Sequence, residues 1–476
     1  MFIQNNQLML IKKSSLYLLF FSIFCFVLVS LFLFLSINTQ EFDIEMFIVS
    51  IFFFFFLTFI IINEEDKFTP IVFFSLLFYG YVFSGLYFSY YQNIHTAKFF
   101  NFSGNFTTQD IKISLFQVIL GYIFFVTGYK IIGKLKTKKI NFEIQGINYS
   151  SNLLKGILIL FFLLSFFYWV YVSFRIAKGP IDLLQNMGIY SFLLENTYIS
   201  TAPYLLAYMT ASFLFLIHLK NRKKISIYLI LMIFTSFIMY VSTARLSGSV
   251  FYLLSFPLMY IIYYKKKLNI KNYVYISLFI IFLGFLYFYR FYSNLSYLGI
   301  EIETNLLNLM GEHFFGMTNF GDLQSITFAR QYTQDVGYLY GASFSDFIRE
   351  WLNRIPGIEI ENTSIGLRLR EFYFSHVSTG APAPGIISEM FINFGYLGLT
   401  LVMFLFGFFA KIITILIDRK NNIVNLYIYT HFLLFFMLLA KVDSSHISSL
   451  LWNIIPFYIL LISVYLSSKL YERIKI

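Results

Sequence analysis

Long apolar runs follow one another along this chain and are separated by short polar segments. Most runs hold about 20 residues, which is enough for an α-helix to cross roughly 30 Å of hydrocarbon. We therefore predict an all-α, polytopic integral membrane protein with about twelve transmembrane helices. The predicted spans are 15–37, 46–63, 68–91, 111–132, 153–174, 200–219, 225–242, 246–264, 272–292, 386–417, 423–440 and 451–468.

The tenth span, 386–417, is too long for one simple crossing. We expect the chain to enter as a short re-entrant piece over 386–392 and to break near Gly395 and Gly398. A long polar segment precedes it. The chain is thus expected to divide into helices 1–9 over 1–292, one large outer loop over 293–384, and helices 10–12 over 385–476.

Lysine and arginine in the short connections set the orientation. With twelve spans, every strong basic cluster falls on the same side of the membrane, which is predicted to be the cytoplasmic side. Both termini are then cytoplasmic and the large loop is outside. The clusters are Lys12/Lys13, Lys130/Lys134/Lys136/Lys138/Lys139, Lys220/Arg222/Lys223/Lys224, Lys265/Lys266/Lys267/Lys271, Arg419/Lys420 and Lys469/Arg473/Lys475.

Composition agrees with this class, because 58% of the 476 residues are hydrophobic and only 12% are charged. Soluble domains carry about 25% charged residues. The net charge of +11 is explained by the cytoplasmic connections, so nucleic-acid binding is not expected. The single cysteine, Cys25, lies in an apolar run and can form neither an intrachain disulfide nor a metal cluster.

The two basic residue types are distributed unequally across the predicted membrane. The inner side holds 20 Lys and 3 Arg, whereas the outer side holds 4 Lys and 8 Arg. Arginine is favoured where planar, bidentate contact with phosphate or carboxylate matters. The outer face is therefore predicted to hold an anion, with snorkelling to lipid headgroups as the alternative for any single arginine.

An amphipathic helix is predicted in the large loop over 343–355. Ser343 is expected to cap its start, and Pro356-Gly357 to end it. It is interpreted as a surface anchor with Trp351 at the membrane interface, or as a lid over a lipid substrate. The predicted apolar face is Phe344, Phe347, Ile348, Trp351, Leu352 and Ile355, and the predicted polar face is Asp346, Arg349, Glu350, Asn353 and Arg354.

The end of the large loop carries the strongest candidate chemistry. Arg368 and Arg370 would share a face if their segment is extended. His376 is a candidate general base, since the pKa of an unperturbed histidine lies near neutrality, and a surface histidine is the alternative. Glu389 lies in the apolar run after the loop, where a carboxylate is costly and indicates function.

Three further arginines are predicted to reach the outer face. Arg245 lies in a short hairpin, Arg290 at the outer end of the ninth span, and Arg175 at the end of the fifth. Two or three guanidiniums together would neutralise a pyrophosphate. The late outer loop KVDSSHISS adds Lys441, Asp443 and His446 as weaker candidates for substrate contact.

The first outer loop contains the acidic run EFDIE, with Glu41, Asp43 and Glu45. These carboxylates could hold a divalent cation, but an ordinary acidic loop is the favoured interpretation. The chain has no phosphate-binding glycine loop, no HExxH, no GxSxG and no Cys/His metal spacing. We therefore expect no metal site and no cofactor.

Two stretches carry a family resemblance: STARLSGSVFYLL (242–254), a short arginine-bearing turn entering a helix, and GAPAPGIISEMFINFGYLGLTLVMFLFGF (380–408). Together with the twelve predicted spans and the large late outer loop, they resemble the O-antigen and capsular polysaccharide polymerases, the Wzy-type oligosaccharide repeat unit polymerases. The resemblance covers the whole architecture. It implies a bacterial cell inner membrane protein whose fold is similar to the metal-independent, GT-C-like integral-membrane glycosyltransferases.

The resemblance also implies a reaction. A glycan on undecaprenyl pyrophosphate would be transferred, at the outer face, to the non-reducing end of another lipid-linked repeat unit. Partners would be the lipid-linked donor and acceptor, membrane lipids and, as a further candidate, a chain-length regulator. Arg175, Arg245, Arg290, Arg368 and Arg370 would bind pyrophosphate or glycan, and His376 or Glu389 would deprotonate the acceptor.

Two other functions compete with polymerisation. An O-antigen ligase would transfer the glycan to a core sugar instead. A flippase or exporter of the lipid-linked repeat is expected to show internal repeats, short outer loops and charges inside the bundle, which this chain does not show.

Overall fold

The computed structural model describes residues 42–90, 107–132, 139–140, 142, 152–185, 202–221, 225–242, 246–264, 288, 310, 323–353, 358, 360, 364–373, 384–417 and 422–474. Within these ranges the chain is helical, without a β-strand, and one isolated bridge pairs Ile140 with Ile417. The elements are α2 (Ile44–Asn63), α3 (Pro70–Tyr90), α4 (Thr108–Ile131), α5 (Asn152–Ile176), α6 (Pro180–Gln185), α8 (Ala202–Lys220), α9 (Ile227–Val241), α10 (Leu246–Tyr264), α13 (Leu323–Asp335), the 3₁₀ helix η4 (Ala342–Ser345), α14 (Asp346–Leu352), α15 (Ile365–Tyr373), α16 (Gly385–Leu397), the π-helix η5 (Gly398–Val402), α17 (Met403–Leu416), α18 (Ile423–Leu439), the 3₁₀ helix η6 (Ser444–His446) and α19 (Ile447–Ile474).

Helices occupy ten of the predicted spans, and the other two, 15–37 and 272–292, lie outside the described residues apart from Phe288. Among the described residues, five helical runs are both long and apolar enough to cross a membrane: α2, α3, α4, α5 and the run Gly385–Leu416. The other apolar stretches found there are shorter and lie in α8, α9, α10, α18 and α19. The all-α membrane class is therefore confirmed, while the total of about twelve spans stays a prediction.

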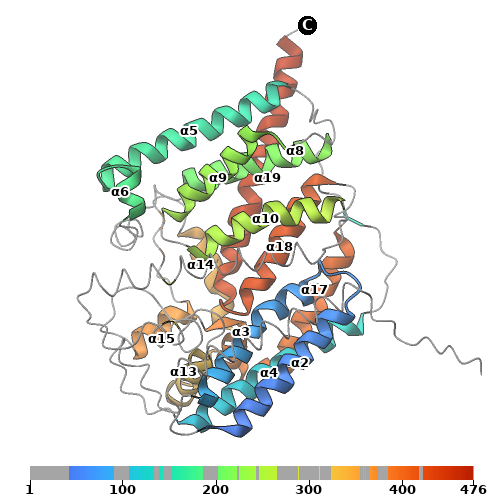
Figure 1. Cartoon of the computed structure of the whole chain (residues 1–476), viewed down its shortest axis with the longest axis vertical. Helices are drawn as coiled ribbons and strands as arrows, with labels where there is room; N and C mark the ends of the chain where they lie inside the picture. Colours follow the sequence, from blue (N-terminus) through green and yellow to red (C-terminus); the bar gives the residue numbers. More distant parts are fainter. Residues whose placement is uncertain are drawn as a thin grey trace, which may run out of the picture.

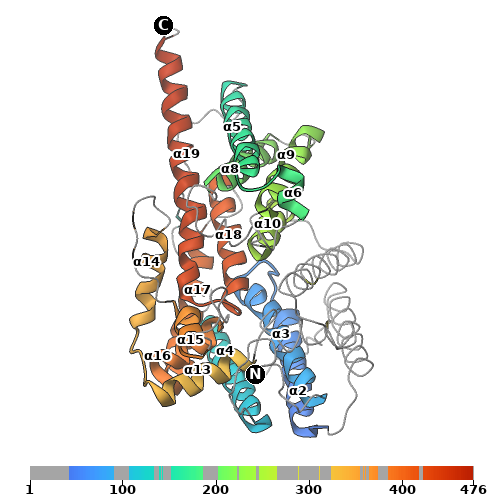
Figure 2. The ribbon, with the colours of Figure 1, turned by 90° about the vertical axis from the view of Figure 1, so that its left-hand side faces the viewer.

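The helices pack in two groups that α18 and α19 join (Figures 1 and 2). In the lower part of Figure 1, α2 packs on α3, and α4 packs closely on α17. In the upper part, α5 packs on α8, which also packs on α9. α18 contacts α3 of the first group and α10 of the second.

Two glycines bring α4 and α17 into backbone contact. A Cβ on Gly128 would lie 1.9 Å from the carbonyl oxygen of Phe404, and one on Gly407 would lie 2.0 Å from that of Phe125. Neither site can accept a side chain without moving the helices apart. Small residues at such crossings let helix backbones approach closely, which is how helices associate tightly where surrounding lipid is as apolar as the side chains.

Polar contacts mark the two ends of the bundle. At one end, Lys112 of α4 pairs with Asp43 at the start of α2 (2.9 Å). At the opposite end, Lys130 of α4 pairs with Glu64, which follows α2. The order of helix ends therefore agrees with the alternation of sides predicted from the sequence. We call the end with Asp43 the loop end, because the large outer loop docks there.

Part of the large loop lies inside the bundle rather than in water. Helix α13 packs between α4 and α16, and its residues 323–329 are buried. Thr327 of α13 is hydrogen-bonded to Ser114 of α4, with 2.7 Å between the hydroxyl oxygens. Arg330 of the same helix forms an ion pair with Asp110 of α4. This segment of the predicted outer loop is therefore buried among helices.

The predicted amphipathic helix is shorter than expected and differently oriented. The segment forms η4 followed by α14, which ends at Leu352. Asp346, assigned to the polar face, is buried, whereas Ile348, assigned to the apolar face, is exposed. Ser343 does not cap the helix but bonds to α16. The prediction failed because α14 packs on α19 and η6 rather than on a flat membrane surface.

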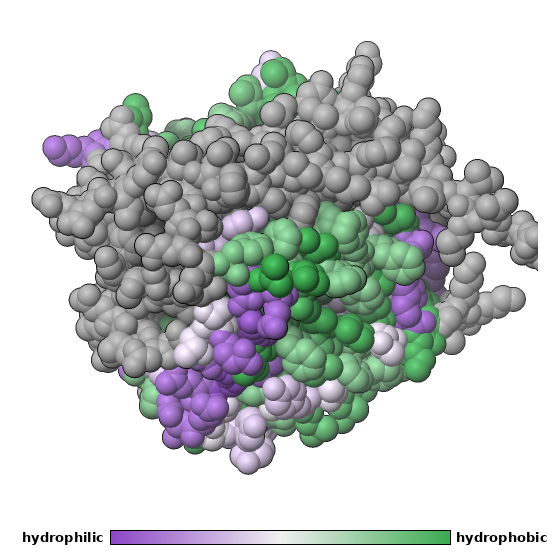
Figure 3. All heavy atoms as spheres, turned by 60° about the horizontal axis from the view of Figure 1, so that its bottom comes forward, coloured by the Kyte–Doolittle hydropathy of each residue, from purple (hydrophilic) through white to green (hydrophobic). Residues whose placement is uncertain are grey.

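The outward side of α2 is apolar, as a lipid-facing helix requires. Ile44, Ile48, Phe52, Phe55 and Phe59 are all exposed and recur at helical spacing. In water such a stripe would favour association, but in a bilayer it meets lipid tails. Where the face turned toward the bottom of Figure 1 is described, its surface is largely apolar with a band of hydrophilic residues (Figure 3).

Candidate functional site

The candidate site is built around the broken tenth span. Gly395 has φ 59° and ψ −140°, a backbone conformation open essentially to glycine, and it interrupts the helix. After the break the chain turns back, so that a Cβ on Gly398 would lie 2.0 Å from the carbonyl oxygen of Met390. In a straight helix these residues would be about 12 Å apart. The predicted break near Gly395 and Gly398 is confirmed.

The break exposes carbonyls that the large loop then satisfies. The N–H groups of Leu339 and Tyr340 donate to the carbonyls of Ile392 (3.0 Å) and Asn393 (3.1 Å). An uninterrupted helix would satisfy those carbonyls from residues four positions onward. The N–H of Gly341 donates to the Asn393 side chain at 2.8 Å. The loop is thus fixed to α16 at the point where the helix fails.

Glu389, in α16, joins three segments that are distant in sequence. It is 1% exposed. One oxygen, Oε1, accepts from the hydroxyls of Ser343 in η4 (2.7 Å) and Ser444 in η6 (2.5 Å). The other, Oε2, accepts from the N–H of Ser444 (2.6 Å). Asn393 extends the network by donating to the Ser343 hydroxyl at 2.7 Å. All three groups bound to Glu389 are donors, so the carboxyl acts as an acceptor at both oxygens.

The turn that contains Ser444 is recessed below the loop end of the bundle. Just before it, the carbonyl of Ala440 accepts a hydrogen bond from Tyr81 (2.6 Å), which lies nine residues before the end of α3 at Tyr90. Nine residues correspond to about 13 Å along a helix. Helix α16 starts at the same depth, since a Cβ on Gly385 would contact both Ala440 and Tyr81. From there α16 runs outward, because Ile392 packs with Phe328 of α13.

Two further ionisable groups lie on this recessed turn. Asp443 is only 5% exposed. Its Oδ1 lies 3.7 Å from Nδ1 of His446, whose side chain is 47% exposed. Helix α14, which carries the buried Asp346, packs directly on η6. A buried carboxylate therefore lies behind an accessible imidazole, in a turn that Glu389 holds.

The predicted arginines are only partly gathered. Arg368 and Arg370 lie in the helix α15, so two residues place them about 160° apart around its axis, and they do not share a face. The extended conformation that would have given them a shared face is not present. Arg175 ends α5, where its Nε donates to the Tyr171 hydroxyl at 3.1 Å. That end of α5 is distant from α15 in both views (Figures 1 and 2).

Three other predicted site residues, Arg245, Arg290 and His376, lie outside the described residues. Helix α15 itself is attached to α13, where the Tyr373 hydroxyl donates to Asp335 at 3.3 Å. Burial, followed by the nearby Asp335 carboxylate, raises the pKa of Tyr373 well above its usual value. The phenol therefore keeps its proton and remains a donor.

The acidic first loop has an explanation within the protein. The Lys112 ammonium lies 2.9 Å from Asp43 and 2.8 Å from Glu45. The other Asp43 oxygen caps α2 by accepting from the N–H of Met46 at 3.0 Å. Glu41 lies outside the described residues. Within the described ranges, no cluster of three or more His, Cys, Asp or Glu side chains is placed to hold a metal.

Several residues of the site were not predicted. Ser343 was assigned to a cap and Ser444 was not considered, because a serine in a polar loop carries no distinguishing pattern. The pair of Arg330 and Asp110 was also missed, although a carboxylate at the border of a span is a signal for a buried partner.

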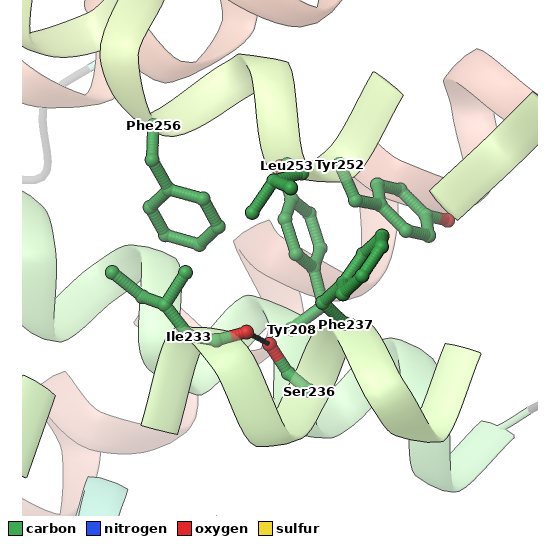
Figure 4. Close-up of a pocket in the computed structure, with 7 residues that line it drawn as sticks. All are labelled: Tyr208, Ile233, Ser236, Phe237, Tyr252, Leu253 and Phe256. Carbon is green, nitrogen blue, oxygen red and sulfur yellow. Dashed lines mark hydrogen bonds between the residues drawn. The ribbon is translucent and has the colours of Figure 1, made fainter. Parts of the chain in front are cut away.

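A second cluster of polar groups lies within the upper helix group. Between α8, α9 and α10, a small pocket is lined by Tyr208, Ile233, Ser236, Phe237, Tyr252, Leu253 and Phe256 (Figure 4). The lining is mostly aromatic and aliphatic, and Ser236 donates to the carbonyl of Ile233 at 2.8 Å. Behind it, the Tyr208 hydroxyl is hydrogen-bonded to His431 (2.8 Å) and to Ser255 (2.6 Å). This cluster is enclosed by the helices and distinct from the Glu389 network.

The fold and the site define an α-helical integral membrane protein in which segments of a long polar loop dock on a broken helix. Comparison with protein families identifies the family of this membrane protein. The chain belongs to the family O-antigen polysaccharide polymerase Wzy, which it matches over residues 17–472. No curated protein and no solved structure matched the chain. Family membership places the protein in polysaccharide and lipopolysaccharide biosynthesis, as a glycosyltransferase-type polymerase that acts on lipid-linked oligosaccharide repeat units.

Proposed function

We propose that this protein polymerises oligosaccharide repeat units carried on undecaprenyl pyrophosphate at the outer face of the bacterial inner membrane. It transfers the growing glycan from its lipid carrier to the non-reducing end of another lipid-linked repeat. The observation that supports this most strongly is the family match over residues 17–472, because it spans the re-entrant helix, the large loop and the turn before α19.

The reaction is a displacement at the anomeric carbon of the donor glycan. The acceptor hydroxyl oxygen forms the new bond to that carbon, and the bond to the pyrophosphate oxygen breaks with its electron pair. Arginines stabilise the departing pyrophosphate in this proposal, by charge and by bidentate hydrogen bonds. The candidates are Arg245, Arg290, Arg368 and Arg370, with Arg175 as a more distant one.

A base must take the acceptor proton, and the sequence proposes His376 and Glu389 for this role. A buried carboxylate with three protein donors on its two oxygens is poorly disposed to take up a substrate proton. Its hydrogen bonds favour a role in holding the loop and the recessed turn together. Among the two candidates, His376 is therefore the better proposal for the base.

The orientation of the protein is part of the proposal. Both termini are cytoplasmic, and the loop end of the bundle faces outward. The support for this orientation is the sequence pattern, in which the lysine-rich connections fall on the side opposite to the large loop. Association with a chain-length regulator also remains a proposal, for which the loop end would be the accessible surface.

The surface glycan profile of a strain lacking this gene tests the proposed function. A lipid A core that bears a single repeat unit is the expected result. Polymerised repeats that accumulate on the carrier lipid without joining the core would instead indicate a ligase. Unpolymerised repeats trapped at the cytoplasmic face would indicate a flippase, and either of these outcomes would contradict the proposal.

A further inference from the structure

The turn between α18 and α19 carries a pair of groups that the proposed function does not yet use. His446 is accessible, and Asp443 behind it is buried. A buried carboxylate near an imidazole fixes its tautomer and stabilises its protonated form, while an exposed ring edge can meet a substrate. We propose that His446, in place of His376, is the general base that deprotonates the acceptor hydroxyl, and that Asp443 and Glu389 are its positioning residues. This inference rests on the proposed polymerase function.

The geometry within the pair sets the direction of proton transfer. Nδ1 of His446 lies 3.7 Å from Asp443 Oδ1, and in the reacting complex that we propose this gap closes to a hydrogen bond, which favours the tautomer with its proton on Nδ1. The lone pair then lies on Nε2, at the far side of the ring. Catalytic contacts in structures without substrate are often longer than in the reacting complex, so 3.7 Å suits a pair that tightens when the imidazole becomes charged.

The backbone position of the pair is fixed by Glu389. The N–H and the hydroxyl of Ser444 both bond to this carboxylate. Ser444 follows Asp443 directly and lies two residues before His446 in η6. A displacement of about 1 Å in a catalytic group can cost roughly 100-fold in rate. Glu389 is only 1% exposed, so it cannot contact the substrate. It acts on the reaction through Ser444 and Ser343, which it contacts.

The recess explains how a base on this turn reaches its substrate. The turn lies at the level of Tyr81, about 13 Å below the end of α3 as a helix measures it. The anomeric carbon of the donor is bonded to the pyrophosphate of its lipid carrier, so the reaction takes place close to the membrane surface. A base set below the ends of the helices, and covered by η4 and α14 from the large loop, is at a suitable depth to act on an acceptor hydroxyl that approaches this carbon.

The proton and electron balance is complete without another reactant. The acceptor O–H bond breaks and its proton moves to Nε2 of His446. The acceptor oxygen bonds to the anomeric carbon of the donor, and undecaprenyl pyrophosphate leaves with the electron pair of the broken bond. The imidazolium formed is stabilised by Asp443, and its proton passes to water after product release.

The test uses the reconstituted full-length protein and undecaprenyl-pyrophosphate-linked repeats isolated from a strain that lacks this gene. The rate of forming the first linkage is measured for wild type and for His446→Gln. We expect the substitution to lower the rate by roughly 10² to 10⁴-fold. His218→Gln is the matched control: His218 lies in the last turn of α8, bonded to the Leu214 carbonyl, and its loss should leave the rate unchanged.

Three further readouts separate catalysis from structure. Imidazole in the buffer should restore part of the rate to His446→Gly. Asp443→Asn should lower the rate by roughly 10 to 100-fold, as expected for a group that orients a catalytic histidine. Glu389→Gln combined with His446→Gln should be no slower than His446→Gln alone, because residues that act as a unit are not additive.

The outcomes are distinguishable. If wild-type protein joins no repeats, the proposed function itself fails. If wild type is active and His446→Gln retains its rate, only the assignment of His446 is overturned. The assignment is also overturned if the rate falls together with the melting midpoint and imidazole restores nothing, since that result describes a structural histidine.

Discussion

The two ends of the helical bundle both carry buried carboxylates, but they use them differently. At the end opposite to the loop, Glu64 pairs with Lys130, and the Lys67 ammonium donates to the carbonyls of Ile61, Ile62 and Glu64. Each group there neutralises a neighbour or completes a helix end. At the loop end, Glu389 and Asp443 are buried close together, with hydroxyls and an exposed imidazole around them.

The difference indicates where function lies. Ion pairs and capping contacts at the first end stabilise helix ends and need no further explanation. Gathering carboxylates away from water is costly, and proteins keep such groups mainly where they serve function. The loop end also combines a broken helix, a docked loop and a recessed turn. The unfavourable free energies of the broken helix and of the buried carboxylates therefore fall in the same region.

The largest expected effect separates the two carboxylates directly. Glu389→Ala should reduce polymer formation by roughly 100-fold or more, because it releases both Ser343 and Ser444 and lets the turn that carries His446 move. Glu64→Ala leaves Lys130, whose side chain is 44% exposed, in contact with water at the end away from the proposed site, so the rate should stay within about twofold. Chain-length distributions and initial rates at equal membrane abundance measure both. Equal losses for the two variants would remove the distinction between the ends.

A glycine at the break is expected to matter next most. Gly395→Ala forces a side chain onto a φ of 59° and places its Cβ 2.9 Å from the Tyr338 hydroxyl, at a cost of about 1–3 kcal/mol. Gly156→Ala in α5 is the control, since a Cβ there meets nothing within 4 Å. Thermal unfolding in detergent measures both. We expect a lower unfolding midpoint for Gly395→Ala and an unchanged midpoint for Gly156→Ala. An unchanged midpoint for Gly395→Ala would show that the break is not required.

A substitution at the end opposite to the loop should lower the stability of the protein but leave its reaction rate unchanged. The Asn425 side chain donates to the carbonyl of Ile140 (2.8 Å) and accepts from the N–H of Phe142 (2.9 Å), which fastens this segment to α18. Asn425→Ala should cost about 1–3 kcal/mol because it removes both hydrogen bonds between this buried amide and the segment. Folded protein should polymerise at the wild-type rate. A slower rate per folded molecule would mean that this end also contributes to the reaction.

The smallest effect is expected to be favourable. Tyr340 has a positive φ of 49° and an exposed side chain in the segment that docks on α16. Tyr340→Gly relieves the left-handed strain and should raise the unfolding midpoint slightly, by up to about 1 kcal/mol in stability. A lower midpoint would show that the tyrosine ring itself holds the segment, most simply through its contact with Tyr338.

The sequence was informative wherever one local pattern decides the structure. Hydrophobic length located the helices, and two glycines in an overlong span located the break at Gly395. Glu389 was selected because a carboxylate in an apolar run has few structural uses. These inferences need no knowledge of distant contacts.

The failures have one physical cause, which is that tertiary contacts override local amphipathicity. Asp346 looked like a surface residue, but α14 packs on η6 and buries it. Arg368 and Arg370 were treated as extended neighbours, although their segment is helical. Ser343 and Ser444 gain their role only because three distant segments meet at Glu389, which no local pattern reveals.

The most direct test of the account asks which end of the bundle faces outward. Replacing the single cysteine by Cys25→Ser provides a background for His446→Cys and, at the opposite end, Lys139→Cys. A membrane-impermeant thiol reagent is applied to intact spheroplasts. The account predicts labelling of His446→Cys from outside, and of Lys139→Cys only after the membrane is permeabilised. Labelling in the reverse order would place the Glu389 network on the cytoplasmic side and contradict an outer site of polymerisation.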